Sequence, residues 1–241
     1  YQELLPSFGV LAGVYRGFSP PAPGSPGVSP ELSVNYEAGM RYSSPSLRAE
    51  LIGYYNDYSN LTDICTLSSG CVDAGLDKQY DAGKARIYGV EAYVQSEPAL
   101  GPVKFPLSAA YTLTRTEFQN GFSSEDPVFG DVKKGDEIPY VPRHQINGML
   151  AAEYGPASVY GTATYISAMR EQAGSAPLSQ VIATDPQFVV DIGAKYRVLR
   201  WLDIYGNVRN LFNELDLVSR RPFGARPNAP RMIQIGVKLK L

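Results

Sequence analysis

Histidine, tryptophan and cysteine are scarce in this sequence, whose 241 residues include one His, one Trp and two Cys. No Ser/His/Asp set appears in the sequence, and two cysteines without a nearby histidine make a poor zinc site. Uncharged apolar runs of about 18 residues are also missing, which excludes a transmembrane helix but not transmembrane β-strands, whose signal is short and half polar. No basic stretch stands out and the formal net charge is -2, which argues against a nucleic-acid partner.

Tyrosine, in contrast, is abundant. The chain has 17 Tyr against 9 Phe, and tyrosine is an amphipathic residue suited to interfaces. Hydrophobic residues make up 44% of the chain and the mean hydropathy is -0.17, so the composition does not indicate disorder. The N-terminal YQELLPSFGVL lacks the basic region, apolar core and cleavage site of a signal peptide, so we expect a mature or truncated chain.

The repeating feature is a stretch of about 10 to 14 residues in which apolar and polar side chains alternate. In the closing PRMIQIGVKLKL, for example, Ile233, Ile235 and Val237 alternate with Gln234 and Lys238. This period of two predicts β-strands with one apolar and one polar face. About ten such strands are expected, at residues 7–18, 33–42, 47–58, 86–95, 105–116, 143–154, 157–167, 188–198, 202–210 and 231–241.

The connections between these stretches alternate between short and long. Short turns are expected near residues 43–46, 97–102, 155–156 and 199–201. Long connections rich in Gly, Pro, Ser and Asp are expected near residues 19–32, 60–84, 118–142, 170–186 and 212–229. In an up-and-down antiparallel sheet this order places every short turn at one end and every long loop at the other, and long loops usually carry function.

A soluble β-sandwich also alternates, but three features favour a transmembrane β-barrel. The strands are longer than the usual five or six residues and match the roughly 9–11 residues of a tilted membrane-spanning strand. The short and long connections alternate as in outer-membrane barrels. The apolar faces freely use small residues such as Ala38, Ala92 and Ala163, which lipid accepts more readily than a packed core does.

Seven segments occur in a fixed order that resembles the C-terminal barrel of TonB-dependent outer-membrane receptors. They are GVYRGFSPP (13–21), NYEAGMRY (35–42), YNDYSNL (55–61), ARIYGVEAYV (85–94), IPYVPRHQ (138–145), VRNLFNE (208–214) and the closing APRMIQIGVKLKL. The loop stretches CTLSSGC and SRRPFGARP are most similar to the branch that includes ferric-citrate-type receptors. The final residue of the family's last strand is usually aromatic, whereas here it is Leu241.

The resemblance implies properties that the residues alone do not establish. Members of the family have barrels of about 22 strands that an N-terminal plug closes, and they import ferric siderophores or similar scarce solutes with energy from TonB. We therefore expect residues 1–241 to form the C-terminal portion of such a barrel in the Gram-negative outer membrane, with the plug and the earlier strands lying outside the sequence. The expected partners are TonB, through the missing N-terminal region, outer-membrane lipid and lipopolysaccharide, and an iron chelate as transported ligand rather than cofactor.

The last long loop, SRRPFGARPNAPR, holds the strongest candidates for ligand contact. Arg220, Arg221 and Arg226 offer guanidinium groups that suit the carboxylates of an anionic citrate-type chelate, and Phe223 lies among them. The alternative is structural, with these arginines pairing with lumen carboxylates or with lipopolysaccharide phosphates at the rim. Arg231 begins the last strand in a PR pair, which favours a structural role.

For three other groups of residues, a structural or solvent-exposed role is weighed against a functional one. Cys65 and Cys71 lie in a loop-like setting that suits a disulfide in an oxidising compartment, or else they are free thiols. The acids of residues 121–142 match no EF-hand spacing, so a solvated loop is expected. These acids are Glu125, Asp126, Asp131, Asp136 and Glu137. The loop aromatics are expected to pack the loops together, with stacking on a siderophore as the alternative; they are Tyr58, Tyr80, Phe122, Phe129 and Phe223.

His144, the single histidine, has the parity of Ile146 and Leu150, so it is expected on the apolar face near the extracellular rim as an interfacial anchor. Ten-stranded outer-membrane proteases exist, but such an enzyme needs a His and acids that converge inside the rim. We therefore expect no enzyme and no catalytic or metal site. The alternative to a receptor portion is a self-contained small barrel that acts as a porin, adhesin or protease, and a third possibility is a soluble β-sandwich.

Overall fold

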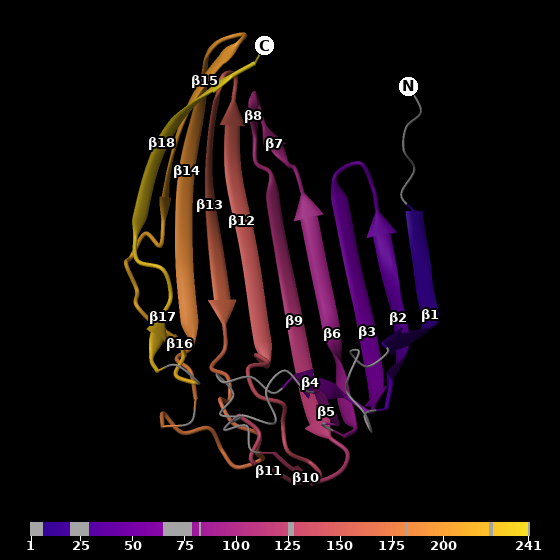
Figure 1. Ribbon diagram of the computed structural model, residues 1–241. Helices are drawn as coiled ribbons and strands as arrows, with labels where there is room; N and C mark the ends of the chain where they lie inside the picture. The colour runs from indigo at the N-terminus through magenta and orange to yellow at the C-terminus, as the bar shows by residue number, and fades with distance from the viewer. Residues whose placement is uncertain are drawn as a thin grey trace.

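The structure, a computed structural model, describes residues 7–19, 29–64, 79–81, 83–124, 128–181, 183–221 and 224–240. Its main body is one antiparallel sheet of ten long strands that curves into part of a barrel wall (Figure 1). The long strands are β1 Ser7–Ser19, β2 Glu31–Ser43, β3 Leu47–Ser59, β6 Ala85–Ser96, β9 Leu107–Phe118, β12 His144–Tyr154, β13 Ala157–Ile166, β14 Gln187–Leu199, β15 Leu202–Arg209 and β18 Met232–Leu239. Within the described ranges, no helix is long and apolar enough to cross a membrane.

Each long strand pairs with the next long strand in the sequence, so the topology is a simple up-and-down meander. Among the described strands, β1 and β18 are not paired with each other, and the sheet is an open part of a barrel. The all-β, up-and-down prediction with about ten strands is therefore confirmed. The boundaries of the long strands differ from the expected ones by up to two residues; for example, the strand expected from residue 105 begins at Leu107. Pro106 precedes it and has no N–H to donate to the ladder.

The connections sort by length as predicted. At one end lie the two-residue turn between β12 and β13, where Gly155 has a φ of 55°, and a small hairpin of β7 Ala99–Leu100 and β8 Val103–Lys104. At the other end the long loops carry three small hairpins (Figure 1). They are β4 Thr62–Ile64 with β5 Gln79–Asp81, β10 Phe122–Ser123 with β11 Asp131–Val132, and β16 Leu217–Ser219 with β17 Arg226–Pro227.

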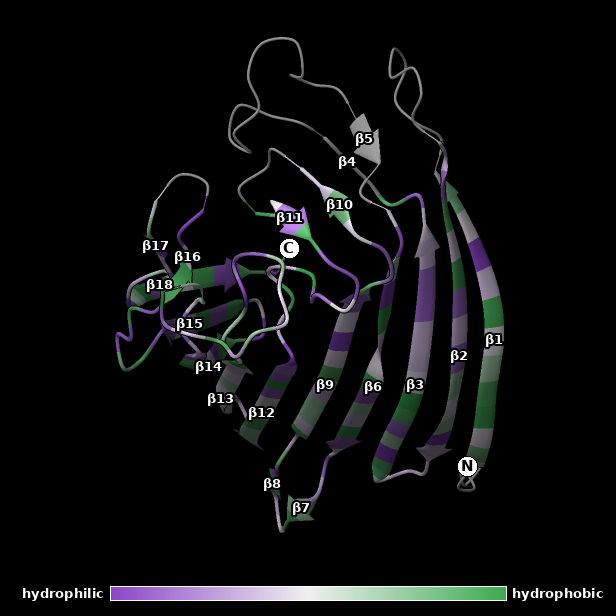
Figure 2. Ribbon diagram, turned by 90° about the horizontal axis from the view of Figure 1, so that it is seen from below, coloured by the Kyte–Doolittle hydropathy of each residue, from purple (hydrophilic) through white to green (hydrophobic). Residues whose placement is uncertain are grey.

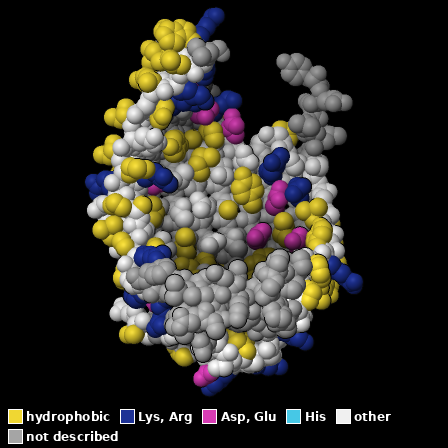
Figure 3. All heavy atoms as spheres, in the orientation of Figure 1, with side chains coloured by type: hydrophobic (Ala, Val, Ile, Leu, Met, Phe, Trp, Pro, Cys, Tyr) yellow, Lys and Arg dark blue, Asp and Glu magenta, His cyan; other side chains and the backbone are white. Residues whose placement is uncertain are grey.

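The two faces of the sheet differ in polarity. Leu51 pairs with Met40 on one side and with Ala92 on the other, and large apolar side chains on this face are exposed, including Ile235 at 84% and Val10 at 74%. Figure 2 shows the alternation as bands along the strands. The concave face carries charged side chains in its hollow (Figure 3), such as the Arg41–Glu50 ion pair at 2.8 Å. No second sheet covers the apolar face within the described residues, and an outward apolar band is typical of outer-membrane barrels.

The buried apolar cluster lies under the long loops rather than in the wall. Phe118, at the end of β9, is fully buried together with Ala85, and Val132 of β11 is nearly so. The Phe118 ring meets the rings of Phe122 and Phe129 edge-on, with centroid distances of 5.4 and 6.1 Å. Packing is thus the role of these two predicted loop aromatics.

Candidate functional site in the loops above the sheet

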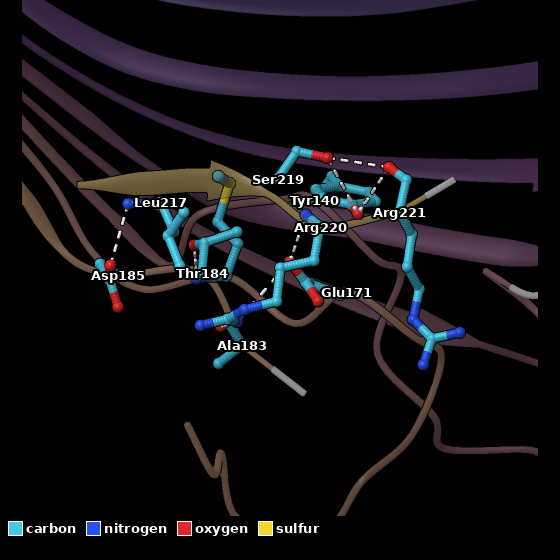
Figure 4. A network of polar contacts seen from close by, with 10 residues as sticks. Tyr140, Glu171, Ala183, Thr184, Asp185, Leu217, Ser219, Arg220 and Arg221 are labelled. Carbon is cyan, nitrogen blue, oxygen red and sulfur yellow. Dashed lines mark hydrogen bonds and ion pairs between the residues drawn. The ribbon is translucent and has the colours of Figure 1, made fainter. Parts of the chain in front are cut away.

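A network of polar contacts fixes the start of the last long loop (Figure 4). Glu171 is only 1% exposed, and its Oε1 accepts a hydrogen bond of 2.8 Å from the backbone N–H of Arg220. The guanidinium of Arg220 lies 3.8 Å from the same oxygen and donates to the carbonyl of Ala183. A buried carboxylate requires such partners, so Arg220 stabilises Glu171, and its predicted contact with a ligand stays a prediction.

The same loop is tied down on both sides of Arg220. Asp185 and Leu217 are joined twice, by the Asp185 N–H to the Leu217 carbonyl and by the Leu217 N–H to Asp185 Oδ2, each at 2.9 Å. Tyr140 donates its hydroxyl to the Arg221 carbonyl at 3.2 Å. Tyr140 has a φ of 57°, a conformation that a bulky residue adopts only when its surroundings enforce it. The IPYVP segment therefore holds the last loop in position.

Arg221 differs from Arg220 in the use of its side chain. Its carbonyl accepts hydrogen bonds from Ser219 and Tyr140, but its guanidinium extends away from the network in Figure 4. In the part of the chain that the structure describes, this guanidinium has no ion pair. Arg221 thus offers a fixed backbone and a free charged end, a combination that suits recognition of an anion.

The other predicted site residues are placed apart. Arg226 begins β17 and is exposed, and Arg231 is exposed while its backbone N–H donates to Asn213 Oδ1 at 2.9 Å. Phe223, Cys65 and Cys71 lie outside the described residues, as do Glu125, Asp126 and the side chain of Tyr80. The ligand and disulfide roles of these residues stay predictions.

The predicted solvated acidic loop is wrong for two of its members. Asp136 is only 6% exposed, and its Oδ2 caps the backbone N–H of Lys133 at 2.8 Å. Glu137 is shared by two arginines, with a hydrogen bond from Arg143 and one of 3.2 Å from Arg170 Nε. Lys133 and Arg143 are close in sequence to these acids, whereas Arg170 comes from a distant segment, and single-sequence spacing gave no sign of that contact.

Sequence reasoning also missed a pocket of about 420 Å³ on the inner face, below the last loop. Arg209 and Arg231 line it, with Asp191 and Met232 between β14, β15 and β18. The pocket is shaped by Asn210, which has a φ of 51° and whose Nδ2 donates to the carbonyls of Glu214 and Ala229 at 2.8 and 2.9 Å. Asparagine tolerates this left-handed conformation, which explains the first asparagine of the VRNLFNE motif.

Among the described residues no group of three or more His, Cys, Asp and Glu is placed to hold a metal ion. His144 lies on the outer face as predicted, opposite Leu113 in the register, with Nδ1 3.0 Å from the Tyr111 hydroxyl. Asp216, in the last long loop, has its pKa raised by burial and by the nearby carboxylates of Glu214 and Asp185. None of these groups forms a nucleophile with an adjacent base.

An antiparallel wall with an outward apolar side, a polar concave side and long loops at one end is typical of β-barrels of the Gram-negative outer membrane. The TonB dependent receptor-like β-barrel family matches residues 1–211 of this chain. The chain therefore belongs to that family of outer-membrane receptors, and the family consists of transport receptors, not enzymes.

Similar proteins include an iron-regulated outer membrane virulence protein of Vibrio cholerae serotype O1, 26% identical over 88% of this chain and 31% of that protein. Among solved structures, the ferric-catecholate import receptor Fiu of E. coli K12 matches with a TM-score of 0.70 and 21% identity over 96% of this chain and 33% of that one. The ferric yersiniabactin uptake receptor FyuA of Yersinia pestis matches with a TM-score of 0.71 and 19% identity, over 96% of this chain and 35% of that one. The chain spans about a third of the length of these proteins.

Proposed function

We propose that this chain forms the C-terminal part of the barrel wall, with several extracellular loops, of a receptor that imports a ferric chelate of the siderophore or iron-citrate type. TonB would energise transport through a region outside these residues. The observation that carries the proposal is a set of arginines without an ion-pair partner in the described part of the chain. Arg221 lies in the braced last loop and Arg209 lies in the inner pocket.

The chemistry of the ligand supports this choice. Citrate-type chelates carry carboxylates, and a guanidinium fork binds a carboxylate through two parallel hydrogen bonds. The pocket at Arg209 and Arg231 opens on the concave side, where a solute would pass, and Asp191 is occupied by its bond of 2.7 Å from the Asn210 N–H. The names of the similar receptors, which handle ferric catecholate and ferric yersiniabactin, support iron chelates as the general class.

The test is uptake of radiolabelled iron chelates by iron-starved cells that express the complete receptor. Replacement of Arg221 or Arg209 by Gln is expected to weaken chelate binding by about tenfold each, because each removes a charge-assisted hydrogen bond. Arg48→Gln is the matched control, since Arg48 is the second residue of β3, at the short-turn end of that strand and far from the long loops. Cells that grow on cobalamin or a sugar through this receptor, but on no iron source, would defeat the iron assignment.

A further inference from the structure

The inner face of the wall carries different charges on its two sides. On β2, β3 and β6 the charged side chains of this face are mostly acidic: Glu31, Glu37, Arg41, Arg48, Glu50 and Glu91. On β14, β15 and β18 they are mostly basic: Asp191, Lys195, Arg197, Asp203, Arg209 and Lys238, with Lys240 directly after β18. The two groups of strands form opposite sides of the curved wall (Figure 1). The field in the hollow therefore attracts an anion toward β14, β15 and β18.

The basic side begins at the inner pocket below the last loop. Arg209 and Arg231 line this pocket, and Arg209 is exposed and forms no ion pair with any residue that the structure describes. Asp191 lines the same pocket and accepts its bond of 2.7 Å from the Asn210 N–H. The pocket thus offers two guanidinium groups to an anion at the long-loop end of these strands.

Two lysines continue the basic side toward the short-turn end. The register places Lys195 opposite Tyr205, which lies four residues before Arg209 on β15, and it places Lys238 opposite Asp203. Four residues of a strand span about 13 Å, and the long side chains of Arg209 and Lys195 can reach into this interval from its two ends. Both lysines are exposed and form no ion pair with any described residue. Their ammonium groups are therefore available for a second contact with an anion.

The surface between these two sets of cations is low and polar. The ring of Tyr205 lies against β18, since a Cβ on Gly236 would clash with its hydroxyl. The ring of Tyr160 lies in the same way on Gly193 of β14. Glycine at these two positions lets the rings lie along the wall instead of across the hollow. Asn207, opposite Gly193 in the register, adds an amide to this surface.

A cluster of charges ends the basic side near the short turns. Asp203 is 3% exposed, and its Oδ2 lies 2.9 Å from Lys240 Nζ while its Oδ1 lies 3.7 Å from Arg197 Nε. A buried carboxylate requires such partners. Because Lys238 is the register partner of Asp203, three cations lie around one carboxylate, and the cluster keeps an excess of positive charge.

We propose that β14, β15 and β18 form a path for the transported anion, which leads from the inner pocket past Lys195 and Lys238 to the short-turn end. Each exposed cation makes a solvent-screened contact that is too weak to retain the anion, so one contact can be exchanged for the next. Lys195 and Lys238 then affect the rate of passage and not the first binding of the chelate. The path rests on the proposed function, since only an anionic chelate would follow a row of cations.

The test separates binding at the loops from passage along the wall. Iron-starved cells that express the complete receptor receive radiolabelled iron as citrate or as a tris-catecholate chelate, both of which are anionic. Surface binding on ice and the initial rate of uptake are measured separately. Lys195→Gln together with Lys238→Gln is expected to lower the uptake rate about fivefold, as for the loss of two exposed charge contacts, and to leave surface binding unchanged. Lys195→Arg together with Lys238→Arg should keep the rate, because both charges remain.

Arg48→Gln is again the matched control, because Arg48 is also an exposed inner-face cation near the short turns but lies on the acidic side. Its uptake rate should equal that of the unchanged receptor. An unchanged rate in the double Gln variant, or an equal loss in Arg48→Gln, would overturn the path although the receptor still imports the chelate. Loss of surface binding in the double Gln variant would also overturn it, by placing the lysines in the first binding site. If the unchanged receptor binds neither chelate, the proposed function fails and the path fails with it.

Discussion

The wall and the rim of this molecule are stabilised in opposite ways. In the wall, backbone ladders join ten strands, and the large apolar side chains face outward, with Ile233 at 68% exposure. At the rim, Phe118 packs beneath the loops at 0% exposure, and the buried carboxylate of Glu171 forms an ion pair with the partly exposed Arg220. The wall thus relies on lipid as its apolar environment, whereas the rim contains a small protein core of its own.

The wall and the rim should tolerate different substitutions. Lipid adapts to the shape of a side chain, so the outer wall tolerates changes of volume but not of charge. The rim contains a packed aromatic cluster and a paired buried carboxylate at Glu171, so it is sensitive to both. Ligand loops need fixed positions, and the rim core holds them at the end of an otherwise uniform sheet.

The largest expected effect comes from Phe118→Ala. Loss of a fully buried ring should destabilise the rim by about 3–5 kcal/mol. The backbone N–H of Gly135 donates to the Phe118 carbonyl, and that of Phe118 donates to the Asp136 carbonyl. These rim amides should then exchange hydrogen faster, whereas the amides of the wall should not. The matched control is Phe188→Ala, which removes a half-exposed ring from the outer face. Equal effects of the two substitutions on rim exchange would refute the distinction between rim and wall.

A smaller effect is expected from a charge placed in the wall. Ala109 and Ala110 are neighbours on β9, and the register puts Ala109 on the lipid-facing side and Ala110 on the inner side. Ala109→Arg should cost about 2–4 kcal/mol, as arginine does near the centre of the bilayer. Ala110→Arg should cost less. Urea unfolding of the complete receptor from lipid vesicles measures both, and a larger loss for Ala110→Arg would reverse the assignment of the faces.

The sequence predicts the wall far better than the rim for a physical reason. Alternation along each strand, as in Ile233 to Val237, is a local signal that lipid on one side and water on the other enforce. The rim depends on contacts such as Glu171 with Arg220 and Tyr140 with Arg221, which join loops far apart in the chain. No periodicity encodes those pairs. For the same reason the sequence could not predict that Arg220 contacts a buried carboxylate while the Arg221 guanidinium has no ion pair among the described residues.

The smallest expected effect concerns the carboxylate of Asp216, whose ionised form is unfavourable in the folded rim. The pKa of Asp216 is raised, first by burial and then by Glu214 and Asp185. A carboxyl with a raised pKa in the folded loop binds its proton more tightly there than in the unfolded chain, so the loop loses stability as the pH rises through that pKa. Asp216→Asn should therefore stabilise the loop at pH 7 by less than about 1 kcal/mol, because solvent screens a partly exposed charge.

The effect of Asp216→Asn should fade at acid pH, where Asp216 is already neutral. Hydrogen exchange of the Asp216 and Asn228 amides reports on it directly, since these two residues are joined by backbone and side-chain bonds of 3.0 and 3.2 Å. Slower exchange in the variant at pH 7, and no difference near pH 3, is the expected pattern. Faster exchange at pH 7 would mean that the ionised carboxylate stabilises the loop, and the rim would then hold this charge as a favourable contact, as it does at Glu171.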